Sequence, residues 1–96
     1  MAGRAREDQL RRAVERLARS QDVLTDAIVQ EQAALMALAN LPAPTDVKAL
    51  GGASRFTSLI RMVTANARKS KRDASALRQA AELAVRDAEI AIEAFD

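Results

Sequence analysis

The chain has 96 residues and a net charge of +2, and 49% of its residues are apolar. It contains no cysteine and no histidine, which excludes disulfides, thiol catalysis and the imidazole that most often serves as general base or transition-metal ligand. Because 22 residues are alanine and only two are aromatic, the core must be built from a few aliphatic side chains. Such a core is small for a domain of this size, which favours pairing with another chain.

Residues 4–40 are predicted to form one long helix, because no proline or glycine interrupts them. Their apolar side chains recur at alternating steps of four and three residues, the spacing that keeps one seam of a helix facing a partner. We interpret the polar seam residues Gln21 and Glu31 as setting register or lying at the seam edge, since no second acid or base stands nearby for catalysis. The predicted seam comprises Leu10, Val14, Leu17, Gln21, Leu24, Ile28, Glu31, Leu35 and Leu38.

A loop at residues 41–54 separates this helix from the second half of the chain. Pro42 and Pro44 disfavour helix here, because proline lacks a backbone donor and restricts the residue before it. Thr45 is suited to cap a short helical turn, and two consecutive glycines are suited to end it. We predict a connector that contains this short turn, with presentation of the loop as a recognition site as the alternative.

Residues 55–95 are predicted to form the second long helix, with the same periodicity but smaller seam residues. Ser70 followed by Asp73 resembles a capping pattern, so a break near residues 70–73, giving a three-helix arrangement, is the alternative. The predicted seam comprises Phe56, Ile60, Val63, Ala67, Ser70, Ala74, Leu77, Ala81, Ala84, Ala88, Ala91 and Phe95.

The fold class that follows is all-α, with residues 1–96 as a single domain. Its two long helices are expected to form an antiparallel, coiled-coil-like hairpin about the loop. Charge supports this topology, since residues 51–78 carry seven basic and one acidic side chain, whereas residues 20–50 carry four acidic and one basic. Opposite charges therefore meet when the chain folds back on itself.

The same charges predict a register for the hairpin. If Leu38 lies near Phe56, Asp22 lies near Arg72. Exposed ion pairs of this kind choose register more than they supply stability. In this register the first helix reaches only to about Ile90, so the C-terminal end of the second helix is predicted to project beyond it.

More apolar surface is present than two seams can bury. The C-terminal part of the second helix is apolar around most of its circumference, and a second apolar patch lies near the loop. Contiguous exposed apolar surface usually marks an interface. We predict that another copy of the chain or a partner protein docks on Leu83, Val85, Ile90, Ile92, Phe95, Val29, Met36, Leu59 and Met62.

A cluster of basic residues in the second helix gives an alternative interpretation. Such residues can follow the phosphates of a nucleic acid electrostatically. No aromatic residues are interleaved for base stacking, and the net charge is low, so nucleic-acid binding ranks second to protein docking. The candidate contacts are Arg61, Arg68, Lys69, Lys71 and Arg72.

Neither an enzyme nor a cofactor or metal site is indicated, because the acids and bases form no cluster beside an evident pocket. The first ten residues contain two arginines and two acids, which is unlike a signal peptide, and no apolar run approaches the roughly 18 residues of a membrane span. We expect a cytoplasmic protein, with export without a cleavable signal as the alternative. Twelve arginines against three lysines, with much alanine, are typical of a GC-rich bacterial genome.

Two segments resemble a known family. The turn at residues 41–44 (Leu-Pro-Ala-Pro) and the tail at residues 85–92 are similar to the needle subunits of bacterial type III secretion systems, although the second helix here is longer. The resemblance implies helical self-assembly through the C-terminal helix. Hairpins exported by type VII systems are similar in length, but their Trp-x-Gly turn is missing, since residues 50–53 read Leu-Gly-Gly-Ala. Neither resemblance assigns the chain to a family.

The function expected from these patterns is that of a non-enzymatic helical interaction module. It would assemble with itself or dock onto a protein through its apolar C-terminal helix, as an adaptor, a small chaperone or a component of a larger bacterial assembly such as a secretion apparatus. The alternative is an accessory protein that binds nucleic acid through the basic face of the second helix.

Overall fold

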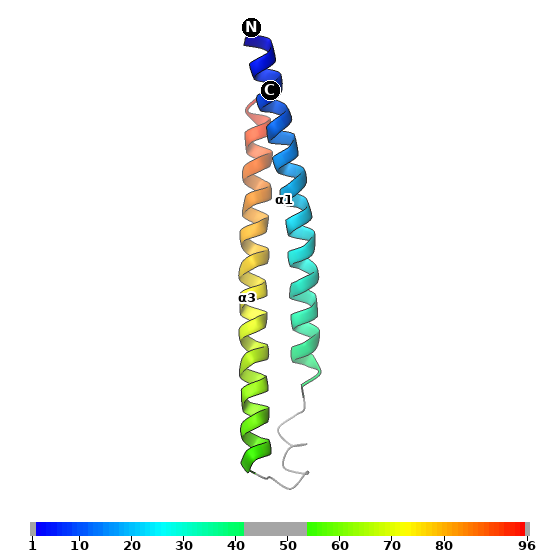
Figure 1. The fold of residues 1–96 in the computed structure, drawn as a ribbon, viewed down its shortest axis with the longest axis vertical. Coiled ribbons are helices and arrows are strands. Elements are labelled where there is room, and N and C mark those ends of the chain that lie inside the picture. The colour runs from blue at the N-terminus through cyan, green and yellow to red at the C-terminus, as the bar shows by residue number, and fades with distance from the viewer. Residues whose placement is uncertain (1, 42–53, 96) are drawn as a thin grey trace.

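A computed structural model of the chain describes residues 2–41 and 54–95. Helix α1 spans Ala2–Ala39 and helix α3 spans Ser54–Glu93. The two helices pack against each other in antiparallel orientation, as Figure 1 shows. The result is a rod of 77 × 16 × 14 Å. The predicted all-α helical hairpin is therefore confirmed, and the predicted short turn in the loop lies outside the described residues.

Both helices are long because nothing in their sequence interrupts them. Their ends lie within two residues of the predicted ranges 4–40 and 55–95. Helix α3 contains no proline or glycine and is continuous through residues 70–73, so the predicted alternative with a break there is wrong. Beyond the last helical residue of α1, the Asn40 N–H still donates to the Met36 carbonyl at 3.0 Å.

Small side chains form the contact between the helices. The buried apolar residues of the described chain are all alanines, and none of its large side chains is fully buried. Two helices approach closely where small residues face each other, and larger neighbours then lie at the edges of the contact. The buried alanines are Ala27, Ala74, Ala81 and Ala88.

In α1 the seam differs from the predicted one at every second position. The sequence argument chose the larger residue of each adjacent pair, whereas close helix approach selects the smaller one. Confirmed seam positions, buried or half-buried, are Leu17, Leu24, Glu31 and Leu38. The other seam residues are Ala13, Ser20, Ala27 and Ala34. Predicted seam positions that are exposed instead are Leu10, Val14, Gln21, Ile28 and Leu35.

In α3 the seam also differs from the predicted one, but here the residue after the predicted position faces α1. The seam takes Thr57, Thr64, Lys71, Arg78, Val85 and Ile92 as its second series. Confirmed positions, buried or half-buried, are Ile60, Ala67, Ala74, Ala81, Ala84, Ala88, Ala91 and Phe95. Predicted seam positions that are exposed instead are Phe56, Val63, Ser70 and Leu77.

The register of the hairpin is shifted by roughly ten residues from the predicted one. Arg78 donates to Glu31 at 2.7 Å, and Arg6 donates to the Phe95 carbonyl at 2.9 Å. As Figure 1 shows, the start of α1 projects beyond the chain's C-terminal end, and the first turns of α3 project beyond the end of α1. Gly3 lies in this projecting start of α1, and a Cβ atom added there would meet no other atom within 4 Å.

The predicted projection of the C-terminal end of α3 is therefore wrong. Val85, Ile92 and Phe95 are half-buried against α1. The prediction relied on exposed ion pairs, which contribute too little free energy to choose a register against the packing of an alanine-lined seam.

Candidate interaction surfaces

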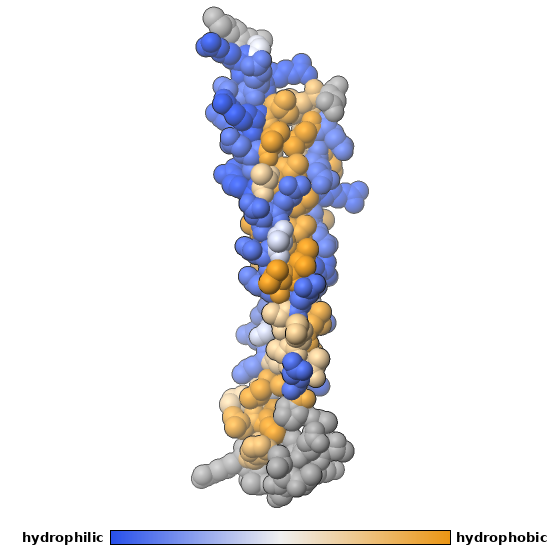
Figure 2. Space-filling model, turned by 90° about the vertical axis from the view of Figure 1, so that its right-hand side faces the viewer, coloured by the Kyte–Doolittle hydropathy of each residue, from blue (hydrophilic) through white to orange (hydrophobic). Residues whose placement is uncertain are grey.

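Large apolar side chains are exposed along both helices. Figure 2 shows apolar surface that runs as a broken stripe along one face, between hydrophilic borders. Exposure of this extent on a chain whose buried core consists of alanines is the main feature of the surface. The exposed large apolar residues are Leu10, Val14, Val23, Ile28, Val29, Leu35, Met36, Phe56, Leu59, Met62, Val63, Leu77, Leu83 and Ile90.

Leu83 and Ile90 lie on the face of α3 that points away from α1. Each comes two residues after a buried alanine of the seam, which is more than half a turn around the helix. Their exposed fractions are 63% and 53%. Of the predicted C-terminal interface residues these two are accessible to a partner, whereas Val85, Ile92 and Phe95 are half-buried in the contact with α1.

The predicted patch near the loop is exposed on both helices. Val29 and Met36 are one heptad apart on α1, and Leu59 and Met62 lie in the first turns of α3. The structure adds Phe56 and Val63 beside these two on α3, and Ile28 and Leu35 beside the pair on α1. The sequence argument missed these four because it assigned them to the seam; the signal for the true seam was the alanine or serine before each large residue of α1.

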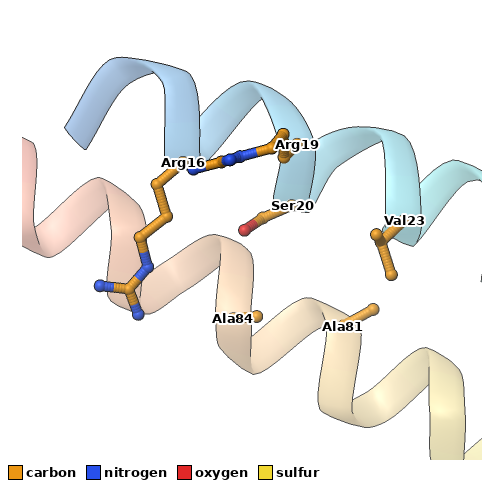
Figure 3. A pocket seen from close by; sticks show the side chains of 6 residues that line it. All are labelled: Arg16, Arg19, Ser20, Val23, Ala81 and Ala84. Carbon is orange, nitrogen blue, oxygen red and sulfur yellow. The ribbon is translucent and has the colours of Figure 1, made fainter. Parts of the chain in front are cut away.

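A shallow groove of about 210 Å³ runs between the helices on one flank. In Figure 3, Ser20 and Val23 point from α1 towards Ala81 and Ala84 of α3, and the side chain of Arg16 reaches across towards α3. The groove exists because alanines on α3 are too short to fill the flank. It is a consequence of the small-residue seam.

The polar contact within the seam joins Glu31 to Arg78. The Arg78 Nε–H donates to Glu31 Oε2 at 2.7 Å, and a second guanidinium nitrogen donates to Glu82 at the same distance. The hydrogen bond from Arg78, opposed by desolvation and aided by one from Ser75, holds the pKa of Glu31 below its ordinary value of 4.5. The pair joins the two helices at this point, and a register-setting role for Glu31 stays a prediction.

The predicted nucleic-acid contacts lie in one part of α3. Arg61, Arg68, Lys69 and Arg72 are exposed, and Lys71 is half-buried in the seam. Because Glu31 pairs with Arg78, the preceding part of α3 lies alongside residues 32–41 or beyond the end of α1. That stretch of the first half contains no acidic residue, so α1 places no carboxylate opposite Arg61, Arg68 and Arg72, whereas the charge of Lys71 helps to lower the pKa of Glu31.

No group of three or more potential metal ligands occurs among the described residues. Neither of the two described helices is long and apolar enough to cross a membrane.

Comparison with protein-family models, with curated proteins and with solved structures finds no match for the chain.

Proposed function

We propose that the chain is a non-enzymatic helical interaction module that docks onto copies of itself or onto a partner protein through its exposed apolar side chains. The role would be that of an adaptor, a small chaperone or a component of a larger bacterial assembly. One observation carries the proposal: large apolar side chains are exposed on both helices, while the buried core consists of alanines.

Energetics supports the proposal. Burial of a large aliphatic side chain contributes about 1.5–3 kcal/mol, whereas an alanine contributes only a fraction of this. A two-helix rod with an alanine core has a small hydrophobic contribution to its stability. Covering exposed residues such as Ile28, Leu35 and Met36 with another helix adds the contribution that the hairpin lacks.

The test compares wild type with a Leu83→Glu, Ile90→Glu double variant in two measurements. Light scattering over a concentration series gives the oligomeric state, and capture on immobilised protein followed by mass spectrometry gives bound partners. We expect wild type to form oligomers or to retain a defined partner, and the double variant to lose at least one of these. The two introduced glutamates weaken docking because their carboxylates would have to lose water when the surface is covered.

A matched control is available on the same face of α3. Lys69→Glu, Ala76→Glu changes two residues at equivalent helical positions, one and two heptads earlier, where no large apolar side chain stands. This variant should keep the wild-type behaviour if apolar contact is what matters. A wild type that stays monomeric and retains the same proteins as the double variant contradicts the proposed function.

Nucleic-acid binding is a second candidate, favoured by the register of the hairpin. The exposed basic residues Arg61, Arg68 and Arg72 lie where α1 has no acid to pair with them. Such a segment attracts phosphates, and the affinity should fall steeply with salt.

A mobility-shift titration over a salt series tests this candidate. We expect binding at low salt to be lost in an Arg61→Ser, Arg68→Ser, Arg72→Ser variant and kept in Arg86→Ser, where an exposed arginine near the acidic end of α3 is removed. Absence of any retardation at low salt would dismiss nucleic-acid binding.

A further inference from the structure

One flank of the hairpin combines apolar and charged residues in a regular order. We call it the mixed face. Its members directly follow one of the two seam series of each helix, namely Ala13, Ser20, Ala27 and Ala34 on α1 and Ile60, Ala67, Ala74, Ala81 and Ala88 on α3. On α1 it presents Val14, Gln21, Ile28 and Leu35. On α3 it presents Arg61, Arg68, Ser75, Glu82 and Glu89.

These two rows lie on the same side of the rod because of the symmetry of the hairpin. Two antiparallel helices are related by an approximate twofold axis perpendicular to both, which keeps equivalent seam-flanking positions on one side. The groove on the opposite flank follows the same rule. It is lined by residues of both helices that directly precede a seam residue, namely Arg16 and Val23 of α1 and Ala84 of α3.

The charges in the α3 row of the mixed face change sign at its centre, Ser75. Two arginines, a serine and two glutamates follow each other at intervals of one heptad, or about 10 Å. Turning a second copy end over end about Ser75 places Arg61 against its Glu89 and Arg68 against its Glu82. A row of this kind is complementary to itself in antiparallel orientation and repels itself in parallel orientation.

We infer that the mixed face binds a second copy of this chain in antiparallel orientation, giving a four-helix bundle with Ser75 of both copies near its twofold axis. This inference rests on the proposed docking function and names its partner. The α3 rows choose orientation by charge, and the α1 rows pack Ile28 and Leu35 of one copy against those of the other.

The dimensions of the rod allow such an interface. A standard protein–protein interface buries about 800 Å² on each partner. A rod of 77 × 16 × 14 Å offers a long face larger than this. The apolar residues Ile28 and Leu35, exposed by 38% and 43%, lie towards the middle of that face, where water is excluded most completely.

The test reverses one charge at a time in the purified 96-residue chain. Arg61→Glu places two pairs of like charges in the antiparallel dimer, and so does Glu89→Arg. Each single variant should raise the dimer dissociation constant about tenfold at low ionic strength, measured by sedimentation equilibrium. Mixing the two variants should restore wild-type affinity as a heterodimer, because every reversed residue then meets its opposite.

The double variant Arg61→Glu, Glu89→Arg provides a second measurement in one chain. It should form a homodimer as tight as wild type, and equal helix content by circular dichroism would show that the single variants are folded. Matched controls are Arg72→Glu and Asp87→Arg, which reverse exposed charges on the outer face of α3 and should leave the dissociation constant unchanged.

Three outcomes would overturn the inference. A parallel dimer joined by the same face would set the α3 row of one copy against the uncharged α1 row of the other, so neither single variant would weaken it. Controls that weaken the dimer as much as the mixed-face variants would show that another face is used. A wild type that is monomeric at every concentration would exclude the second copy, whereas the docking function would then be decided by the capture experiment with the Leu83→Glu, Ile90→Glu variant.

Discussion

Glu31 and Arg78 form the polar contact in a seam otherwise built mainly from small and aliphatic residues. Their side chains are 18% and 25% exposed, and Arg78 bridges Glu31 of α1 and Glu82 of its own helix. The sequence placed Glu31 on the seam correctly. The predicted register did not bring Arg78 opposite Glu31, because that register was inferred from surface charges that contribute little.

Glu31 is predicted to make stability depend on pH in the acid range. Its pKa is lowered in the folded state, chiefly by the hydrogen bond from Arg78, so its stabilising contribution is complete above the ordinary value of 4.5 and is lost as pH falls through the folded-state pKa. Urea denaturation should show Glu31→Gln less stable than wild type at pH 7 and equal to it at strongly acid pH. Glu15→Gln, at an exposed position of α1, should match wild type at both; a difference between wild type and Glu31→Gln that persists unchanged in acid would contradict the prediction.

Ala88 has no exposed surface, which makes it a sensitive test of close helix approach. Ala88→Leu should destabilise the hairpin by about 1–3 kcal/mol, because the larger side chain forces the helices apart. Ala80→Leu adds the same atoms on the exposed side of α3 and should change the free energy of unfolding by less than about 0.5 kcal/mol. Equal effects of the two substitutions in urea denaturation at one protein concentration would argue against the alanine seam.

At the scale of the helices, the sequence predicted their number and their ends well but their contact only in part. Helix propensity and the absence of breakers are local properties, so the bounds of α1 and α3 follow from the sequence. The rotation of each helix is not local. It depends on how closely the two backbones approach, and this choice between adjacent residues such as Ala27 and Ile28 is settled by the partner helix.

The exposed apolar surface, like the contact between the helices, was predicted only in part. Leu83 and Ile90 were expected off the seam, and the structure exposes both. Ile28 and Leu35 could not be found while larger residues were assumed to face inwards. Their interface role and that of the predicted residues stay predictions until association is measured.

The register predicts different effects for truncation at the two ends of the chain. Removing residues 1–5 deletes the projecting start of α1 and should change the free energy of unfolding by less than about 0.5 kcal/mol. Removing residues 91–96 deletes the half-buried Ile92 and Phe95 and should cost about 1–3 kcal/mol. Urea denaturation of both truncated chains measures this; the register first inferred from charge predicts the reverse order of effects.

At the scale of the whole molecule, the protein is a narrow rod that has surface in excess of its core. Helical hairpins of this shape bury one stripe per helix, and the apolar residues outside that stripe remain accessible. The exposed large apolar residues extend from Leu10 to Met36 on α1 and from Phe56 to Ile90 on α3. Association alongside the rod covers them, whereas association end to end does not.

Small-angle X-ray scattering distinguishes these two modes of association. An antiparallel dimer centred near Ser75, which lies close to the middle of the rod, should double the scattering mass but extend the maximum dimension by only about 10 Å beyond the 77 Å of one copy. Its cross-sectional radius should rise. A dimer nearly twice as long as the monomer would mean that the rods join at their tips and that the long faces stay free.

The alanine seam also has a consequence for sliding. Ala67, Ala74, Ala81 and Ala88 repeat at every heptad, so a shift of α3 along α1 by one heptad, about 10 Å, brings an alanine back to three of these four positions. Glu31 and Arg78 lose each other in such a shift, and so do the contacts at the two ends of the rod. The Glu31–Arg78 ion pair therefore favours the observed register over one shifted by a heptad, in which the repeated alanines alone would discriminate little.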